Sequence, residues 1–321
     1  MGQRDDGPDA PVAVVIVTWN VAALLRDCLH SLARQDVPLE VLVVDNASAD
    51  GTPAMVRSEF PHVRLLASER NLGFGGGNNR ALFELAADGA ARPAPELVFL
   101  LNPDTVVRPG AVRALRAHLA GAERAGAVGP LLRNADGTVQ SSRRRFPTLL
   151  TGLAESTPLE WHWRDNPVAR HYRMADVPPD APGAVDWLTG AALLLRRRAL
   201  AAVGPFDERF FMYSEELDLC RRLQSCGWEV RFEPAAEVVH LEGRSSNQVP
   251  WQRQLWFHKA RVRYFAKHHG RLAATVVRGG VLAQFALETA LEGAKWLSGH
   301  KRAVRRDRLR AYAGLLRDGL G

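Results

Sequence analysis

The stretch PVAVVIVTWN, residues 11–20, is the first of four strand-like runs that together predict the fold. It is rich in β-branched residues and has no polar residue before Thr18, which is typical of a strand buried on both faces of a sheet. The runs LEVLVVD, HVRLLAS and ELVFLL follow, separated by segments with helical periodicity. This alternation predicts an α/β fold, in which helices cover both faces of an open, mainly parallel sheet.

Polar side chains follow three of these predicted strands, at the point where each strand ends. They are Thr18 with Asn20, Asp45, and Asn102 with Asp104. Ligands of open α/β sheets bind beyond the carboxyl ends of the strands. An Asx turn at Asp45 or a helix cap at Asp104 would explain either residue alone. Polar residues at three strand ends favour a ligand site.

The segment NLGFGGGNN, residues 71–79, has four glycines between Gly73 and Gly77. Glycine allows close backbone approach to a ligand, and the segment precedes a helix predicted near 79–87, whose N-terminus would favour an anion. It is neither a Walker A loop nor a GxGxxG motif. A flexible loop is the alternative, but the neighbouring strand ends favour a loop that faces a ligand.

The segment FFMYSEELDLC, residues 210–220, places Glu215, Glu216 and Asp218 within four positions between apolar residues. Neighbouring like charges and apolar surroundings raise the pKa of a carboxyl group. A raised pKa suits a general base that works near neutral pH. The alternative is that three acids at a helix N-terminus are stabilised by the helix dipole.

Composition limits the class of protein. The chain has 321 residues, of which 46% are hydrophobic and 24% charged, as expected of a soluble globular protein of one or two domains. Its three cysteines have no metal-ligand spacing, which favours a reducing, cytosolic environment. The polar N-terminal residues do not resemble a secretory signal. The longest uncharged run in the last seventy or so residues is too short to cross a bilayer.

Charge is concentrated at one end of the chain. Residues 251–321 contain 15 Lys and Arg against 4 Asp and Glu, whereas residues 1–250 contain 27 against 31. A basic tail of two or three amphipathic helices predicts an anionic partner, although solvated helix faces would give the same composition. We do not expect nucleic acid, because the tail has no recognised motif and the acidic body would oppose binding. Peripheral contact at the inner face of the cell membrane is the remaining prediction.

Six segments occur in one order along the chain: VTWN, DNASADGT, NLGFGGGNN, LLNPDT, WLTGA and GPFDERFFMYSEELDLCRR. Together they resemble the inverting family-2 glycosyltransferases with a GT-A fold. The likeness is greatest to the bacterial rhamnosyltransferase-like branch, which builds cell-surface glycans from nucleotide-activated sugars. It covers roughly Val12 to Ser245, about three-quarters of the chain.

The resemblance also implies a domain organisation. A GT-A catalytic domain is expected over residues 11–249, with a disordered segment before it at 1–10 and the basic helical tail after it at 250–321. Within the catalytic domain, the nucleotide-binding half is expected over 11–126 and the acceptor half over 127–249.

The resemblance assigns residues to the donor and to a metal ion. Asn102 and Asp104 stand where relatives have a metal-binding Asp-x-Asp, so Asp104 is expected to make the main metal contact. His240 matches a histidine that completes the metal site in some relatives. Carboxylate oxygens favour Mg²⁺ or Mn²⁺ as the cofactor. The donor contacts implied are Thr18, Asn20, Asp45, Asn71, Gly73, Gly76, Asn102 and Asp104.

In relatives, the second acid of a Glu-Asp pair at this position is the general base. Here the pair is Glu215 and Glu216, so the resemblance makes Glu216 the expected base. Because Glu replaces Asp, Glu215 remains an alternative. The residues expected on the acceptor side are Trp187, Thr189, Gly190 and Asp218.

The resemblance therefore implies a metal-dependent inverting transferase. It would move L-rhamnose from dTDP-L-rhamnose onto a lipid-linked or cell-surface glycan. Two alternatives stay open: the same fold with a UDP-hexose or UDP-galactofuranose donor, and an inactive protein that binds nucleotide sugars. The sequence does not decide between a monomer and a homo-oligomer.

Overall fold

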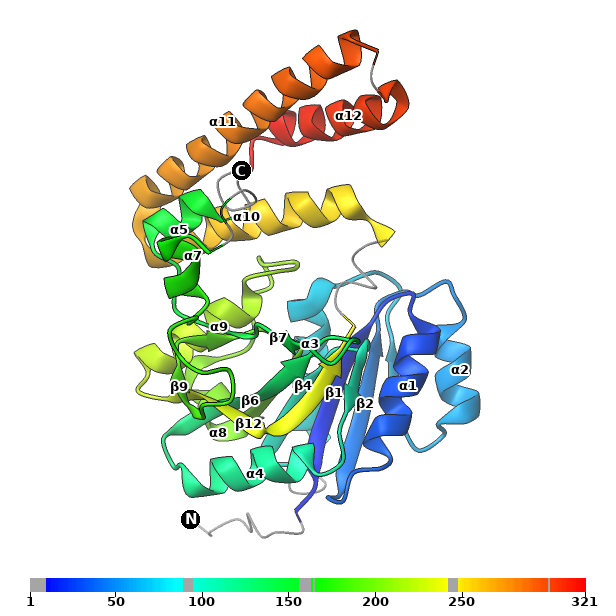
Figure 1. Ribbon diagram of the computed structural model, residues 1–321. Coiled ribbons are helices and arrows are strands. Elements are labelled where there is room, and N and C mark those ends of the chain that lie inside the picture. Colours follow the sequence, from blue (N-terminus) through cyan, green and yellow to red (C-terminus); the bar gives the residue numbers. More distant parts are fainter. Residues whose placement is uncertain (1–9, 89–94, 156–162, 164, 242–247, 300) are drawn as a thin grey trace. The chain divides into compact units, whose positions relative to one another are not determined.

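The computed structural model describes residues 10–88, 95–155, 163, 165–241, 248–299 and 301–321 (Figure 1). The segment 1–10, expected to be disordered, lies outside these residues except for Ala10. The chain divides into two compact units. The first unit comprises Met1–Phe146, Arg173–Phe211 and Glu215–Gln248. The second unit comprises Pro147–Tyr172, Met212–Ser214 and Val249–Gly321.

The first unit is built on one mixed sheet with the strand order β3-β2-β1-β4-β11-β6-β12-β5. Strands β1 to β4 are mutually parallel, β11 runs antiparallel to β4 and β6, and β12 is parallel to β6. The prediction of a mainly parallel α/β sheet is therefore confirmed. The strands are β1 (Val12–Thr18), β2 (Leu39–Asp45), β3 (Arg64–Ala67), β4 (Leu97–Leu101), β5 (Thr105–Val107), β6 (Ala125–Arg133), β11 (Ala192–Arg196) and β12 (Glu229–His240).

Four short strands complete this unit. β7 (Val139–Gln140) pairs with β6 and β9 (Gly183–Val185) pairs with β12, both antiparallel. A separate ribbon joins β8 (Arg143–Arg144) to β10 (Trp187–Leu188). The β6–β7 hairpin turns at Gly137, whose φ of +84° favours glycine.

Helices cover both faces of the sheet. Alternate residues of β1, including Val14 and Ile16, share a core with α1, α2 and α4. On β1, Val17 packs instead against α3. Residues of opposite parity point to opposite faces of a strand, so α3 covers the second face. The helices of this unit are α1 (Ala22–Leu32), α2 (Thr52–Glu59), α3 (Gly73–Asp88), α4 (Ala111–Gly121), α8 (Arg197–Val203) and α9 (Glu215–Ser225).

The glycine-rich segment forms the first turns of α3 rather than a loop. The predicted start near Asn79 was wrong, because the helix begins at Gly73. The Asn71 side-chain oxygen accepts a hydrogen bond from the Gly73 amide (2.9 Å), which caps the helix. Gly73 has a φ of +74°, and a Cβ at Gly77 would lie 2.6 Å from a Val17 methyl carbon. These glycines allow α3 to pack directly on β1.

The second unit is helical and has its own core of Tyr264, Phe265, Val277 and Phe285. A Cβ at Gly152 would lie 2.6 Å from the Phe265 ring, so α5 packs closely on α10. Three helices occupy the tail, within the range expected from its periodicity. The unit also includes Pro147–Tyr172, which lies within the range 127–249 expected for the acceptor half. Its helices are α5 (Leu149–Ala154), α7 (Pro167–Tyr172), α10 (Pro250–His268), α11 (Gly270–Leu297) and α12 (Arg302–Asp318).

Within this unit α11 and α12 lie side by side (Figure 1), joined by an ion pair between Arg305 and Glu292 at 2.5 Å. Among the residues that the structure describes, no helix combines the length and the hydropathy needed to cross a bilayer.

Candidate active site

Buried polar atoms without partners lie at the carboxyl ends of β1 and β2. Parallel pairing sets Thr18 beside Asp45. Both residues are about 1% exposed, yet the Thr18 hydroxyl and one Asp45 carboxylate oxygen have no hydrogen-bond partner among the residues that the structure describes. Buried polar groups are usually paired, because leaving one unpaired costs about 1–3 kcal/mol. These atoms are therefore suited to a ligand that supplies polar partners.

The loop after β2 is held in place by its neighbours. The Asn20 amide donates to the Ser48 hydroxyl (2.9 Å), and the Asn20 side-chain oxygen accepts from the Ala49 amide (2.7 Å). Asn46 donates from its side chain to the Gly73 carbonyl (3.0 Å), and its own amide oxygen remains unpaired and buried. These hydrogen bonds thus hold the carboxyl ends of β1 and β2 and the N-terminus of α3 next to the unpaired atoms.

Asp104 and His240 meet on neighbouring strands. β5 and β12 pair antiparallel, with Thr105 opposite His240. The Nε2 atom of His240 lies 3.4 Å from an Asp104 carboxylate oxygen and 3.4 Å from the Asn102 side-chain nitrogen. Both Asp104 and His240 are buried. A neutral imidazole nitrogen and a carboxylate side by side are a suitable donor pair for a divalent cation.

This pair alone supplies too few ligands to enclose a metal ion. Among the described residues, no group of three His, Cys, Asp or Glu side chains is arranged to hold a metal ion. Mg²⁺ and Mn²⁺ at phosphate-transfer and nucleotide sites take one or two protein ligands and complete their shell with substrate phosphates and water. Asp104 and His240 fit that role, with the remaining ligands supplied by a bound diphosphate.

The Glu216 carboxylate lies beside the loop that leads into β11. The Gly190 amide donates to a Glu216 carboxylate oxygen at 3.4 Å. One residue on, the Ala191 carbonyl accepts from the Asn102 amide at 2.9 Å. The loop at Gly190 therefore joins Glu216 to the turn that carries Asp104.

The two adjacent glutamates have different environments. Glu215 is 4% exposed, whereas Glu216 is partly exposed. One oxygen of each has no partner. Burial raises the pKa of Glu215 well above its usual value, and the charge of Glu216 adds to the effect. Burial also raises the pKa of Glu216. Desolvation outweighs the helix dipole, which is worth only about 0.3–1 kcal/mol at an exposed helix end. Of the two residues, Glu216 is the more exposed.

The family model described as "Glycosyltransferase like family 2" matches residues 8–259, most of the chain. The chain belongs to this family. A relative in Mycobacterium tuberculosis, N-acetylglucosaminyl-diphospho-decaprenol L-rhamnosyltransferase, is 37% identical over 282 residues, which cover 87% of this chain and 91% of the relative. Rhamnosyltransferase WbbL of Escherichia coli is 25% identical over 271 residues, covering 80% of this chain and 93% of that one.

A solved structure shares the fold of this family-2 glycosyltransferase. The mannosyltransferase of Pyrobaculum calidifontis, solved with GDP-mannose and Mn²⁺, superposes with a TM-score of 0.55 at 18% identity. The superposition covers 98% of this chain and 88% of the mannosyltransferase. The expected GT-A architecture, a mixed and mainly parallel sheet with helices and a helical C-terminal extension, is confirmed.

Two residues predicted on the acceptor side of the glycosyltransferase are packed into its interior. Asp218 is fully buried and pairs with Arg222 at 2.8 Å, and Arg222 also donates to the Val203 and Gly204 carbonyls. Trp187 is 8% exposed, and its indole nitrogen donates to the Arg145 carbonyl at 3.0 Å. These contacts support a structural role for both side chains.

Other predicted residues lie in different settings. Thr189 has a buried hydroxyl without a partner, next to Gly190 and hence close to Glu216. By contrast, Gly73 and Gly76 are buried, and protein atoms lie next to the place where a Cβ would stand. Asn71 serves as the cap of α3. The glycine-rich segment of the glycosyltransferase thus has a packing role that accounts for its composition.

Sequence reasoning missed Gln140. Its side-chain oxygen lies 2.7 Å from Nδ1 of His240, one hundred residues away in the chain. The signal was weak: Gln140 follows the Asp136-Gly137 turn, at the position where the returning strand of a hairpin would lie. Only the pairing of β7 with β6 brings it to His240.

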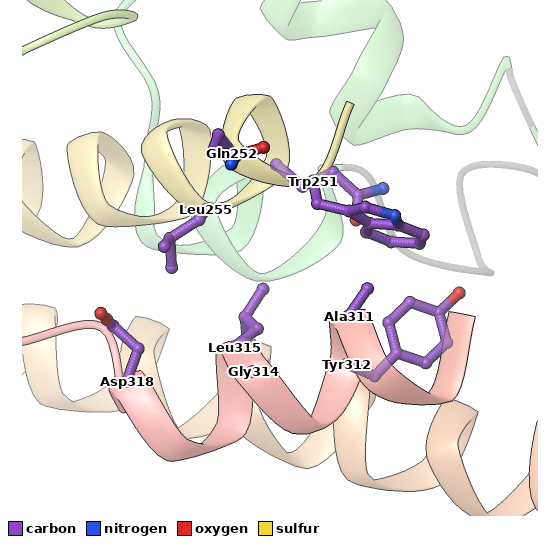
Figure 2. A pocket seen from close by; sticks show the side chains of 9 residues that line it. Trp251, Gln252, Leu255, Ala311, Tyr312, Gly314, Leu315 and Asp318 are labelled. Carbon is purple, nitrogen blue, oxygen red and sulfur yellow. The ribbon is translucent and has the colours of Figure 1, made fainter. Parts of the chain in front are cut away.

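A pocket of about 270 Å³ lies elsewhere, within the second unit, between α10 and α12 (Figure 2). The Trp251 and Tyr312 rings meet edge to face at its mouth, 5.9 Å between centroids, and Leu255 and Leu315 line it. Asp318, the carboxylate among the lining residues, pairs with Lys259 at 2.8 Å. Asp318 is the only acid among these lining residues.

Proposed function

We propose that this glycosyltransferase transfers L-rhamnose from dTDP-L-rhamnose to an N-acetylglucosaminyl diphospho-polyprenol, with inversion at the anomeric carbon. The relative with 37% identity carries this acceptor and this sugar in its name, and the similarity spans 91% of that relative. The observation that carries the proposal is the position of Glu216. Its carboxylate contacts Gly190 in the loop that also fastens the Asp104 turn, so an acceptor at Glu216 would stand next to a donor diphosphate at Asp104.

On the donor side, the unpaired atoms of Thr18, Asp45 and Asn46 would bind the nucleoside. The free Asp45 oxygen is an acceptor, which suits the imide N–H of thymine or a ribose hydroxyl. Asp104 and His240 would hold Mg²⁺ or Mn²⁺, which when bound offsets the charge that develops on the departing diphosphate. The Pyrobaculum mannosyltransferase was solved with both a nucleotide sugar and Mn²⁺.

On the acceptor side, Glu216 takes the proton from the attacking hydroxyl group. The hydroxyl oxygen forms a bond to the anomeric carbon as the bond from that carbon to the diphosphate breaks on the opposite face. The electron pair leaves with dTDP, and the proton remains on Glu216. The raised pKa of Glu216 makes it a stronger base than an exposed glutamate.

Product analysis with defined substrates tests this proposal. The protein would be incubated with N-acetylglucosaminyl diphospho-polyprenol, Mg²⁺ or Mn²⁺, and either dTDP-L-rhamnose, UDP-glucose, UDP-galactofuranose or GDP-mannose. We expect a rhamnosylated lipid with the first donor, dependence on the cation, and inverted configuration by NMR. Transfer from a UDP-sugar alone would replace the donor assignment. Donor binding without product would instead favour a nucleotide-sugar-binding protein.

We also propose that the second unit contacts the membrane in which such an acceptor resides. On α11, apolar side chains at helical spacing form an exposed stripe, which we define as Leu272, Val276, Leu287, Leu291 and Leu297. Leu272 is 80% exposed and Leu297 is 71% exposed. Exposed leucines are costly in water, and residues 251–321 carry an excess of basic side chains that attracts anionic lipid. The apolar stripe and the positive charge together support peripheral binding at the cytoplasmic face of the membrane.

A further inference from the structure

The β6–β7 hairpin contains a continuous set of side-chain hydrogen bonds that ends at His240. The set runs from Asp136 through Thr138, Asn134 and Gln140. Each of these residues is in the hairpin, whereas His240 is at the end of β12. Asp136, at one end of the set, determines which partner donates and which accepts in every one of these hydrogen bonds.

Asp136 fixes the direction because an ionised carboxylate can only accept hydrogen bonds. The pKa of Asp136 is lowered, first by the hydrogen bond from the Thr138 side chain. The Thr138 hydroxyl donates to Asp136 at 2.6 Å, so its proton is committed. That hydroxyl must then act as acceptor toward Asn134, whose side-chain nitrogen lies 2.9 Å away.

The orientation of two amides follows. With its nitrogen directed at Thr138, Asn134 presents its oxygen to the Gln140 side-chain nitrogen at 3.0 Å. Gln140 therefore presents its oxygen to His240, and the 2.7 Å contact requires a proton on Nδ1 of the imidazole. A neutral imidazole carries one proton, so Nε2 retains its lone pair.

The Nε2 lone pair faces the place where the cation is proposed. The Asn102 side-chain nitrogen, a donor, lies 3.4 Å from Nε2, and an Asp104 carboxylate oxygen lies at the same distance from it. Two electron-rich atoms facing each other at this distance are stabilised by a cation between them. Groups that hold the second nitrogen of a ligating histidine change metal affinity by about 10–100-fold.

We infer that Gln140 is a positioning residue that keeps the His240 proton on Nδ1 and directs the Nε2 lone pair at Asp104. The effect of Gln140 on metal binding rests on the proposed function, but the assignment of the His240 tautomer does not. The residue acts through His240 and needs no contact with substrate. The hairpin thus supports the proposed donor site through Gln140 alone.

The tautomer can be measured directly in protein labelled with ¹⁵N-histidine, without metal, by long-range ¹H–¹⁵N NMR above the pKa of histidine. His240→Gln identifies the signals. We expect protonated Nδ1 and bare Nε2 in the wild type, and a mixture of tautomers in Gln140→Leu. Gln140→Glu keeps an acceptor for Nδ1 and should restore the wild-type tautomer. Gln224→Leu loses two hydrogen bonds to backbone carbonyls but contacts neither His240 nor Asp104, so it should match the wild type.

Mn²⁺ binding in the presence of dTDP, followed by the EPR signal of free Mn²⁺, gives the second measurement. Gln140→Leu should weaken affinity by about tenfold, while Gln140→Glu and Gln224→Leu retain it. A wild-type His240 with its proton on Nε2, or an unchanged tautomer in Gln140→Leu, overturns the inference. If the tautomer responds to Gln140→Leu but the wild type binds no Mn²⁺, the inference stands and the metal assignment of the proposed function fails.

Discussion

At the scale of single residues, the arrangement that matters most is the pair of adjacent glutamates at the start of α9. Their sequence neighbours are alike, but Glu215 is buried while Glu216 is partly exposed and contacts Gly190. Consecutive helical residues point about 100° apart, so one can face the core while the other faces the loop at Gly190. This difference in surroundings is why we propose Glu216, and not Glu215, as the general base.

Glu216→Gln should lower kcat by about 10²–10⁴-fold with little change in donor KM, because the amide cannot accept the acceptor's proton. Glu216→Asp should retain part of the activity. In the wild type, burial raises the pKa of Glu216, so the acidic limb of the kcat/KM profile should lie above the range of an ordinary glutamate. Initial rates of rhamnosyl transfer across pH measure the activity of both variants and the pH profile of the wild type. Full activity in Glu216→Gln, with loss in Glu215→Gln, would move the base to Glu215.

Glu215→Gln should stabilise the protein, increasingly so at alkaline pH. Burial raises the folded-state pKa of Glu215 above its unfolded value, so the protonated side chain favours the folded state. That contribution is complete below the unfolded pKa and is lost as pH rises through the folded pKa. The Tm of the mutant should exceed that of the wild type by an amount that grows across the pH range above the ordinary pKa of glutamate, about 4.3. A constant difference in Tm across this pH range would contradict a raised pKa of Glu215 in the folded protein.

At the scale of elements, close packing between α3 and β1 explains the glycine-rich sequence. Gly77 contacts Val17 so closely that any side chain must displace it. Gly121, at the end of α4, has no atom within 4 Å of its Cβ position. The same substitution therefore has opposite consequences at the two sites.

Gly77→Ala should destabilise the fold by about 1–3 kcal/mol, because the added methyl group overlaps a buried side chain. Gly121→Ala should be neutral or stabilise it by up to about 1 kcal/mol, because alanine loses less backbone entropy in a helix. Urea denaturation of both variants measures the two effects. Equal stability changes of the same sign would contradict the packing of α3 on β1.

At the scale of the whole molecule, the two units differ in their charge and in their exposed apolar surface. The first unit contains the buried polar atoms of Thr18, Asp45 and Asn46 described above and the two glutamates, while the tail of the second unit carries an excess of 11 positive charges over residues 251–321. Under the membrane contact proposed above, charge would attract the tail to anionic lipid over a distance of about 10 Å, and exposed leucines would then enter the interface.

Replacing Leu272, Leu287, Leu291 and Leu297 together with Gln should reduce binding to phosphatidylglycerol vesicles by at least about tenfold. Co-sedimentation measures the bound fraction, which should also fall as salt increases. Phe83→Gln removes an apolar side chain that is 59% exposed in the first unit, and it should leave binding unchanged. Equal binding by wild type and the fourfold variant would exclude the stripe as a membrane contact.

The sequence by itself determined the features that depend on local pattern. Buried strands appear as apolar runs, and polar residues at their ends mark the ligand edge, because the period of side chains along a strand is set by backbone geometry alone. Thr18, Asp45 and Asp104 were predicted in this way, together with the α/β class, whereas Glu216 was predicted from the resemblance of its segment to the family-2 glycosyltransferases. The excess of basic side chains in the tail is likewise a property of composition.

Only the tertiary structure decided which distant residues meet. The contact of Gln140 with His240 depends on the β6–β7 pairing and on the position of β12 beside β6, neither of which a local pattern encodes. The same is true of Asp218, which resembles its acidic neighbours in sequence but turns inward to Arg222. The start of α3 at Gly73 depends on room beside Phe211 and Val17. Periodicity specifies which face of an element is apolar, whereas the register between elements depends on packing over the whole chain.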